Sequence, residues 1–289
     1  MSYDYNRMMC DIKILNSNYS DFIEYFSIGK SVMERDIPCM CVGRGEKKLL
    51  LIGAHHGLEY LTSAFLTKFL SNYIVKLITN TEYFGHDIRE LYKKATLFIV
   101  PMMNPDGVDI AINGLDITNP YHRRLISMVG IHSFDTVWQA NARGVDLNHN
   151  YNADWSMVAE RPAPSKFGGE HPESEPETQA VVKLIRENNI DMILAFHSQG
   201  REIYYDFGGL ESKRARSIAL KLSDASGYTV AHPTGTAAFG GCKDWFIGEF
   251  GKEGYTIEIG EGKNPLPDEA LYEIYDENAR LVLTAMNEL

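Results

Sequence analysis

Three short segments of the sequence carry the residue types of a catalytic metal site. An apolar segment ends at Gly53 and is followed by His56 and Glu59, which lie three residues apart and can converge on one point. A second apolar segment ends in His197. Two histidines and one glutamate form a ligand set of catalytic zinc, which keeps its fourth position for water. Together, these segments predict one zinc ion per chain, held by His56, Glu59 and His197.

The third segment places a carboxylate inside an apolar strand. In the predicted strand from Tyr255 to Ile259, alternation puts Glu258 on the face opposite Tyr255, Ile257 and Ile259. Such a carboxylate is either a buried ion-pair partner of a lysine or arginine, or a general base whose pKa burial raises. A lone histidine at a strand end also has a purely structural interpretation. The coincidence of all three segments favours the catalytic site.

The composition excludes several classes of protein. Of 289 residues, 28 are lysine or arginine and 39 are aspartate or glutamate, a net charge of −11 that argues against a nucleic-acid or anionic-membrane surface. The hydrophobic content of 44% is typical of a globular chain. The longest apolar stretch, residues 95–103, is too short to span a bilayer and the start resembles no export signal, so we expect a cytoplasmic protein. The four cysteines have no zinc or redox spacing and are expected to be reduced.

Predicted strands and helices alternate along the chain. The predicted strands are residues 39–42, 48–53, 95–103, 191–196, 228–231 and 255–259, and the predicted helices begin near residues 59, 174, 212 and 268. The first two strands are interpreted as a hairpin, residues 174–177 as a capping box, and residues 107–173 as long ordered loops.

This alternation predicts an α/β fold. We expect a single domain over residues 1–289, with a mixed, mostly parallel twisted sheet and helices on both faces. Residues 1–20 are interpreted as an N-terminal lead-in and residues 20–285 as the catalytic core. Ligands of such sheets bind at the carboxyl ends of the strands, where the histidines lie.

The sequence resembles the zinc metallocarboxypeptidases over about residues 20–285. The motifs that carry the resemblance are His56-x-x-Glu59, Asn104-Pro105-Asp106-Gly107, Gly144-Val145-Asp146-Leu147-Asn148-x-Asn150, His197-Ser198 and Thr256-Ile257-Glu258. Further motifs, Gly53-Ala54-His55-His56-Gly57, Lys243-Asp244-Trp245-Phe246 and Lys263-Asn264-Pro265, resemble the bacterial γ-D-glutamyl-meso-diaminopimelate peptidase branch. The resemblance implies the carboxypeptidase-like, or phosphorylase/hydrolase-like, fold.

The resemblance also implies a role for individual residues. His56, Glu59 and His197 would bind zinc, and Glu258 would be the general base. Asp146 would accept a hydrogen bond that orients a zinc-binding histidine. Asn148 would face a carboxylate of the substrate.

Several positions depart from the family's pattern. His149 stands where carboxypeptidases carry an arginine that grips the terminal carboxylate of the substrate, and Ile247 stands at the expected place of their active-site tyrosine. The expected oxyanion-stabilising cation is replaced by Gln139, which leaves Arg143 as the catalytic candidate on that loop. Lys243, His149 and Arg143 are the candidates for binding substrate carboxylates. His55 is expected to be structural and to point away from His56.

These departures favour an endopeptidase, because a weaker hold on a free C-terminus lets the substrate continue beyond the cleaved bond. The leading hypothesis is a zinc-dependent peptidase that cleaves the γ-D-glutamyl to meso-diaminopimelate amide of murein stem peptides, using water activated by zinc and Glu258. One alternative is a zinc carboxypeptidase or amidohydrolase acting on ordinary α-peptides or acyl amino acids. The other is an inactive relative that binds murein peptides. The sequence leaves the oligomeric state and the preferred stem-peptide length open.

Overall fold

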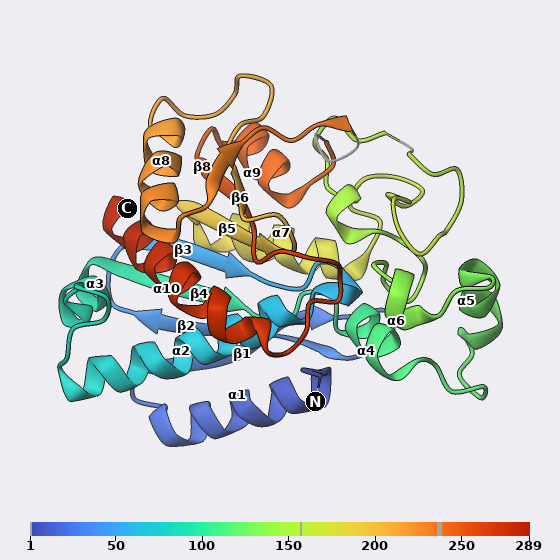
Figure 1. Ribbon diagram of the computed structural model, residues 1–289, viewed down its shortest axis with the longest axis horizontal. Coiled ribbons are helices and arrows are strands. Elements are labelled where there is room, and N and C mark those ends of the chain that lie inside the picture. Colours follow the sequence, from blue (N-terminus) through green and yellow to red (C-terminus); the bar gives the residue numbers. More distant parts are fainter. Residues whose placement is uncertain (1, 157, 236–238) are drawn as a thin grey trace.

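The protein is built around one twisted sheet with helices on both faces (Figure 1). This computed structural model describes residues 2–156, 158–235 and 239–289. In these residues the sheet has eight strands, which are β1 (Ile23–Lys30), β2 (Asp36–Gly43), β3 (Lys47–Ile52), β4 (Ala95–Val100), β5 (Met192–His197), β6 (Glu202–Tyr204), β7 (Thr229–Ala231) and β8 (Glu253–Glu258). Their order across the sheet is β1-β2-β4-β3-β5-β8-β6-β7.

The centre of the sheet is parallel and its flanks are partly antiparallel. Strands β4, β3, β5 and β8 run in one direction, whereas β2 is antiparallel to β1 and β4, and β6 is antiparallel to β8. Every residue of β4 and β5 is buried, as expected for strands with neighbours on both sides and helices on both faces. The predicted α/β class with a mixed, mostly parallel sheet is confirmed.

The predicted hairpin of the first two strands is wrong. β4 lies between β2 and β3, antiparallel to the first and parallel to the second. The glycines near residue 44 suggested a tight turn, but a local turn signal does not decide which strand becomes the neighbour. The wholly apolar β4 needs a central position to bury both of its faces, and it takes the place beside β3 after a helical crossover.

Helices pack on the two faces of the sheet around two apolar cores. On one face lie α1 (Tyr5–Tyr19), α2 (Leu61–Thr79), α3 (Ile88–Lys94), α8 (Ala215–Ser226) and α10 (Ala270–Glu288), and on the other lie α7 (Pro176–Asn188) and α9 (Cys242–Phe250). The predicted lead-in thus contains a helix, α1, whose Met8, Ile12 and Leu15 are buried at i, i+4 and i+7 spacing. Within the described part of the chain, every helix is too short or too polar to cross a membrane.

The segment between β4 and α7 contains short helices as well as the predicted loops. These are α4 (Pro105–Asn113), α5 (His122–Val129), α6 (Phe134–Val137) and the 3-10 helix η2 (Leu147–His149). The expected turn at residues 104–107 is the start of α4, because Asn104 accepts a hydrogen bond from the Gly107 N–H at 2.9 Å and Pro105 occupies the first turn. α4 contacts the 3-10 helix η1 (Gly57–Glu59), which carries part of the predicted metal site.

The predicted capping box at the start of α7 does not form. Glu175 is the N-cap residue and its side chain makes no capping hydrogen bond. Glu177 is buried instead, where it accepts hydrogen bonds from the Val32 N–H at 3.1 Å and the Asn141 side chain at 3.2 Å. Burial, together with the charges of Asp106 and Glu175, raises the pKa of Glu177 to about 8. The Glu177 carboxyl therefore bonds to distant segments of the chain and does not cap its own helix.

We expect Glu177→Gln to remove part of the pH dependence of stability. Between the ordinary glutamate pKa and about 8, the folded chain holds a proton on Glu177 that the unfolded chain has lost. The free energy of unfolding therefore falls as the pH rises through this window, and glutamine does not titrate. Urea unfolding at pH 5 and pH 8 measures the fall, which should be smaller in Glu177→Gln. Glu187→Gln, on the exposed side of the same helix, should keep the wild-type fall; equal behaviour of the two variants would contradict the assignment.

Candidate metal centre

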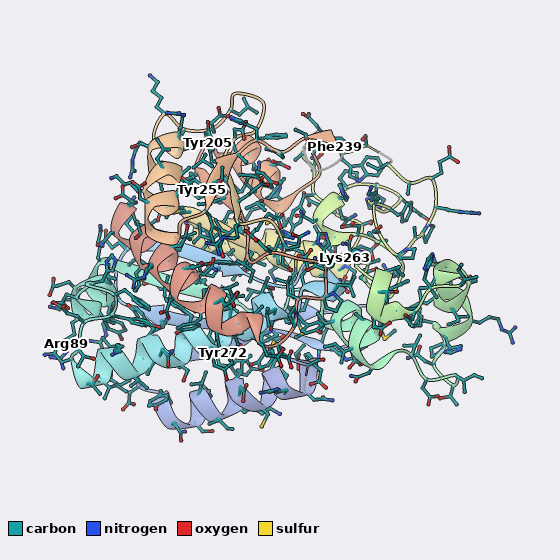
Figure 2. The ribbon with its side chains drawn as sticks, viewed as in Figure 1. Arg89, Tyr205, Phe239, Tyr255, Lys263 and Tyr272 are labelled. Carbon is teal, nitrogen blue, oxygen red and sulfur yellow. The ribbon has the colours of Figure 1, made fainter. Side chains whose placement is uncertain are left out.

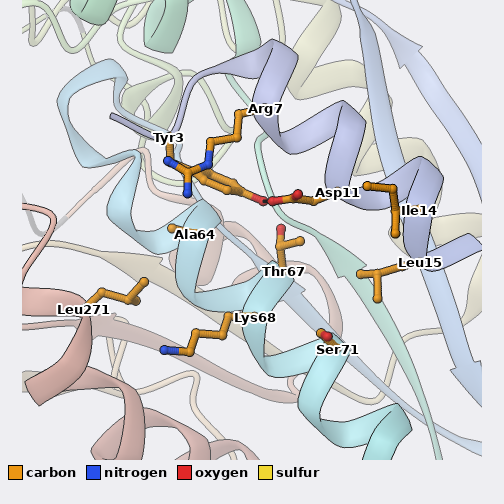
Figure 3. A pocket seen from close by; sticks show the side chains of 10 residues that line it. All are labelled: Tyr3, Arg7, Asp11, Ile14, Leu15, Ala64, Thr67, Lys68, Ser71 and Leu271. Atoms are coloured by element: carbon orange, nitrogen blue, oxygen red, sulfur yellow. Dashed lines mark hydrogen bonds between the residues drawn. The ribbon is translucent and has the colours of Figure 1, made fainter. Parts of the chain in front are cut away.

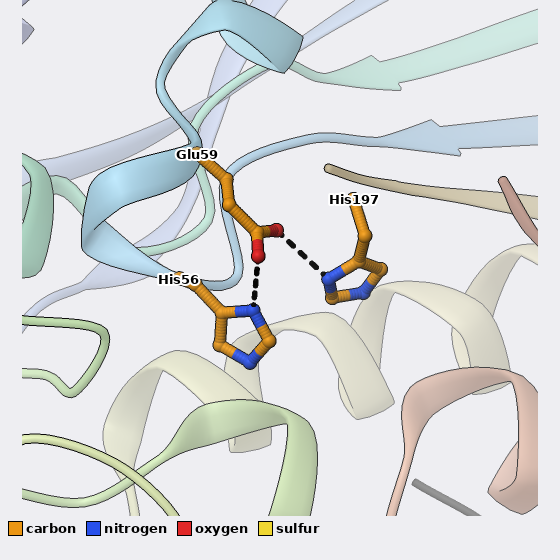
Figure 4. Close-up of side chains that lie close together, drawn as sticks. All are labelled: His56, Glu59 and His197. Carbon is orange, nitrogen blue, oxygen red and sulfur yellow. Dashed lines mark hydrogen bonds and ion pairs between the residues drawn. The ribbon is translucent and has the colours of Figure 1, made fainter. Parts of the chain in front are cut away.

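Three side chains converge at the carboxyl edge of the sheet (Figure 4). His56 follows β3, Glu59 ends η1, and His197 is the last residue of β5. Nδ1 of His56 lies 2.8 Å from Oε1 of Glu59, and Nδ1 of His197 lies 3.0 Å from Oε2 of the same carboxylate. One possible ligand atom from each residue lies within 4.8 Å of the other two. The fold thus brings together the three residues that the sequence singled out.

The backbone after β3 turns sharply to present His56 and Glu59. Ala54 has a φ of 50°, in the left-handed region that is unfavourable for residues other than glycine. Gly57 lies against the start of α4, where an added Cβ would come within 2.4 Å of the Gly107 carbonyl oxygen. Glycine alone allows this close approach, which holds η1 in place.

The hydrogen bonds of His56 fit a metal ligand. Its Nε2 lies 3.1 Å from Oδ1 of Asp146, and because a carboxylate only accepts, the neutral ring carries its proton on Nε2. Nδ1 also faces an acceptor, the Glu59 carboxylate, so either a second proton or a bound cation must lie between these two atoms. A cation can take the place of that proton, and two imidazoles with one carboxylate suit Zn²⁺. A carboxylate on the second nitrogen is a common support for a zinc-binding histidine, which is the arrangement expected for Asp146.

The charges of the group favour a cation at this point. Burial acts to lower the pKa of His56, but the carboxylates of Glu59 and Asp146 outweigh it and raise that pKa well above its usual value. Burial acts to raise the pKa of Asp146, but the attraction of His56 and a hydrogen bond from the Lys166 N–H hold it well below the usual range. The two histidines likewise lower the pKa of Glu59 against the effect of burial.

Glu258 lies beside this group and is not a member of it. It is paired in register with His197 on the neighbouring parallel strand, and both side chains project from the same face of the sheet. The alternation predicted for this strand is confirmed, because Tyr255 and Ile257 are buried in the core of the opposite face. Among the described residues Glu258 has no lysine or arginine within ion-pair distance, which removes the structural alternative. Burial and the charges of Glu59 and Glu202 raise its pKa well above the usual value, while His56 acts to lower it.

The sequence profile of the zinc carboxypeptidase family matches residues 8–281. The chain belongs to the zinc carboxypeptidase family. It is 37% identical, over 290 residues, to gamma-D-glutamyl-L-diamino acid endopeptidase 1 of Lysinibacillus sphaericus, an alignment that covers 99% of this chain and 72% of that protein. The predicted zinc cofactor and the class of metallopeptidase are confirmed by this membership and by the histidine–glutamate–histidine group.

Solved structures show the same fold at lower sequence identity. Bovine thrombin-activatable fibrinolysis inhibitor, in complex with tick carboxypeptidase inhibitor, matches with a TM-score of 0.79 and 20% identity, covering 100% of this chain and 97% of that chain. Murein-tripeptide amidase MpaA from Escherichia coli O157 matches with a TM-score of 0.56 and 21% identity, covering 90% of this chain and 91% of that chain.

Asn264 contacts the histidine–glutamate–histidine group of this member of the zinc carboxypeptidase family, although the sequence indicated no role for it. Its Nδ2 donates to the Ser198 carbonyl oxygen at 2.6 Å and lies 3.3 Å from Oε1 of Glu59, and its Oδ1 accepts from the Ser198 hydroxyl at 2.8 Å. Asn264 thereby links the segment after β8 to the end of β5. The only sequence signal was its place in a motif shared with one branch of the family, which carries no information about its contacts.

His55 lies closer to the metal centre than expected. Its ring stacks on that of His197 with centroids 5.1 Å apart, and its Nε2 lies 3.2 Å from the Tyr151 hydroxyl. It is fully buried and is not part of the ligand group. The expectation that it points away from the site is wrong, because alternation along the chain does not hold through the turn at Ala54.

Asn148 and His149 lie in η2, directly after Asp146. Oδ1 of Asn148 accepts a hydrogen bond from the Cys242 N–H at 3.2 Å, which ties η2 to the start of α9. Nδ1 of His149 is buried and has no hydrogen-bond partner among the described atoms. The centroid of its ring lies 6.2 Å from that of Phe239. Phe239 is labelled in Figure 2. Both candidates therefore belong to the loop that carries the partner of His56.

Lys243 is buried in the first turn of α9. Its Nζ donates to the Asp206 carbonyl oxygen at 2.5 Å and forms an ion pair with Asp244. An added Cβ on Gly254 would lie 3.4 Å from its Cγ, so Lys243 packs on β8. Gly254 and Glu258, four residues apart on this strand, share one face of the sheet. Lys243 is thus a fixed positive charge on the face that carries Glu258.

Two expected positions do not join the metal centre. Arg143 lies 3.6 Å from Glu175 and lines a cavity of about 350 Å³ to which neither the metal group nor Glu258 contributes. Ile247 is fully buried within α9, so its side chain packs in the core. Gln139, by contrast, accepts a hydrogen bond from the Gly57 N–H at 3.0 Å through its backbone, next to His56.

A second cavity lies between α1 and α2, near the start of α10 (Figure 3). It has a volume of about 350 Å³, and Tyr3, Arg7, Asp11 and Lys68 are among its lining residues. None of the residues that line it belongs to the metal centre. This cavity is therefore separate from the histidine–glutamate–histidine group at the strand ends.

Proposed function

We propose that the protein hydrolyses the amide between γ-D-glutamate and meso-diaminopimelate in murein stem peptides. The observation that carries the proposal is Glu258, a carboxylate beside the histidine–glutamate–histidine group that forms no ion pair with a lysine or arginine of the described residues. His56, Glu59 and His197 would hold the zinc ion, which when bound would supply Lewis-acid activation of water and of the carbonyl group. Glu258 accepts a proton from the attacking water and delivers it to the leaving amine. Asp146 keeps His56 in the orientation that directs Nδ1 towards Glu59, where the metal would bind.

The choice of substrate is supported by a relative and by the residue at position 149. The similar protein of Lysinibacillus sphaericus is named a gamma-D-glutamyl-L-diamino acid endopeptidase. His149 lacks the guanidinium group that would form two hydrogen bonds with a terminal carboxylate, so a peptide that continues past the cleaved bond can bind. We infer that Asn148, His149 and Lys243 bind the carboxylates of the stem peptide, which for the buried Lys243 requires its ion pair with Asp244 to open. Arg143 stays the proposed oxyanion partner, which requires its ion pair with Glu175 to open.

Release of diaminopimelate from L-Ala-γ-D-Glu-meso-diaminopimelate tests the proposal. We expect the zinc-loaded protein to release it, a chelator to abolish the release, and added zinc to restore it, because the metal centre is needed for the reaction. The same bond should be cut when D-alanine follows diaminopimelate. An α-peptide blocked at its C-terminus should remain intact.

Two other outcomes identify the alternatives. Chelator-sensitive release of residues from ordinary C-termini alone would indicate a carboxypeptidase or amidohydrolase. Binding of the stem peptide to the zinc-loaded protein without any release would indicate an inactive relative.

A further inference from the structure

A second carboxylate, Glu202, lies next to the proposed general base. Strand β6 pairs antiparallel with β8, and Glu202 is the register partner of Glu258. Directly opposed residues of such a pair have Cβ atoms about 5 Å apart on the same face of the sheet. An added Cβ on Gly200 would lie 3.7 Å from Oε2 of Glu202 and 3.7 Å from Cβ of Glu258. Both acidic side chains therefore flank the same glycine.

No cation of the described chain forms an ion pair with Glu202. Its carboxylate accepts a hydrogen bond from the Tyr204 hydroxyl at 2.5 Å. The adjacent Arg201 is engaged elsewhere, 2.7 Å from Glu277 and 3.7 Å from Glu261. Glu202 is half-buried, so a molecule bound at the site can reach it. Two carboxylates this close repel each other, and a cation that comes between or beside them is attracted to both.

The strand register places Glu202 and Glu258 on the same face of the sheet. Ile203, between Glu202 and Tyr204, is buried in the core of the opposite face with Ile257. Glu202 and Tyr204 therefore project from the face that carries Glu258, on the side of β8 that lies away from His197. A substrate whose cleaved bond lies between the metal group and Glu258 can extend one strand further to Glu202. The first charged group it would meet there is the Glu202 carboxylate, which attracts cations.

We propose that Glu202 is a specificity-determining residue that binds the side-chain ammonium group of a diamino acid on the leaving side of the cleaved bond. This inference rests on the proposed function, because it assigns a partner to one group of that substrate. Ordinary amino acids other than lysine and arginine bring no cation to this position, whereas a diamino acid always does. Tyr204 holds the carboxylate by its hydroxyl, and the ammonium completes the pairing.

The test compares two substrates that differ only in the ammonium group. One is L-Ala-γ-D-Glu-meso-diaminopimelate, and the other carries L-2-aminopimelate, which lacks the second amino group. A charge-assisted hydrogen bond of this kind corresponds to a preference of about ten- to a hundredfold in kcat/KM. We expect the wild type to show this preference and Glu202→Gln to lose it, through a slower reaction of the diamino substrate. Glu249→Gln, an exposed carboxylate on α9, is the matched control and should keep the preference.

The ratio of kcat/KM for the two substrates separates recognition of the ammonium group from effects of Glu202 on catalysis or folding. Any influence of Glu202 on Glu258 or on folding changes both substrates alike and leaves the ratio unaltered. Equal cleavage of the two substrates by the wild type, or a preference that survives in Glu202→Gln, overturns the role of Glu202 while the proposed function stands. A wild type that cleaves neither substrate overturns the proposed function and this inference with it. Unfolding curves of Glu202→Gln matching those of the wild type show that the variant is folded.

Discussion

Glu258→Gln is expected to keep its zinc and to lose at least about a hundredfold in the rate of peptide hydrolysis. A positioned general base contributes about a hundred- to ten-thousandfold to the rate of proton transfer. Burial and the neighbouring charges of Glu59 and Glu202 raise the pKa of Glu258, which suits a group that must take up a proton. Glutamine has nearly the same shape but cannot accept that proton. Because Glu258 is not part of the ligand group, the metal should stay bound.

Steady-state kinetics and elemental analysis of zinc measure the two halves of this prediction. Glu261→Gln removes an exposed carboxylate three residues further along the chain, whose partner is Arg201, and should retain the wild-type rate. Near-normal turnover of Glu258→Gln would overturn its assignment as the base. Loss of zinc from the same variant would mean that Glu258 is a ligand.

His197→Ala is expected to weaken zinc binding by more than about a hundredfold and to abolish hydrolysis. Loss of an outer hydrogen-bond partner of a metal ligand costs about ten- to a hundredfold in affinity, and loss of the ligand itself costs more. His197 offers one of three possible ligand atoms, and its Nδ1 lies 3.0 Å from the Glu59 carboxylate. Zinc bound per chain, measured across a series of buffered free-zinc concentrations, gives the affinity.

The control for this variant is His132→Ala, which removes an exposed histidine outside the ligand group. It should bind one zinc ion per chain as tightly as the wild type. Unfolding of the metal-free proteins checks that His197→Ala is folded, since His197 is buried. Unchanged zinc affinity in a folded His197→Ala protein would contradict the assigned metal centre.

The metal centre could be predicted because its residues stand at the ends of recognisable strands. Apolar runs that end at residue 53 and at His197 are local patterns, and each was followed by a side chain with metal-binding chemistry. Alternation along β8 was equally local and correctly separated Glu258 from Tyr255 and Ile257. Two of these strands, β3 and β5, are neighbours in the sheet, so their carboxyl ends meet at one edge.

Other parts of the site depended on contacts between distant segments. Asn264 reaches Glu59 across 205 positions of the chain, and no local pattern indicates which side chain a loop asparagine will touch. His55 stacks on His197 because the turn at Ala54 breaks the alternation on which its expected direction depended. Arg143 was chosen as a charge near a motif, and its ion pair with Glu175 holds it in a different cavity.

The sequence by itself determined the kinds of residue at each strand end, the face on which Glu258 lies, and membership of the family, because these follow from short-range periodicity and from motifs. The tertiary structure alone decided that β4 separates β2 from β3, and that β6 lies beside β8 with Glu202 opposite Glu258. Strand neighbours are selected by how completely the whole chain buries its apolar surface, and that quantity depends on all the elements together. The placement of the Glu202 carboxylate next to Glu258 is therefore a property of the fold and not of any one segment.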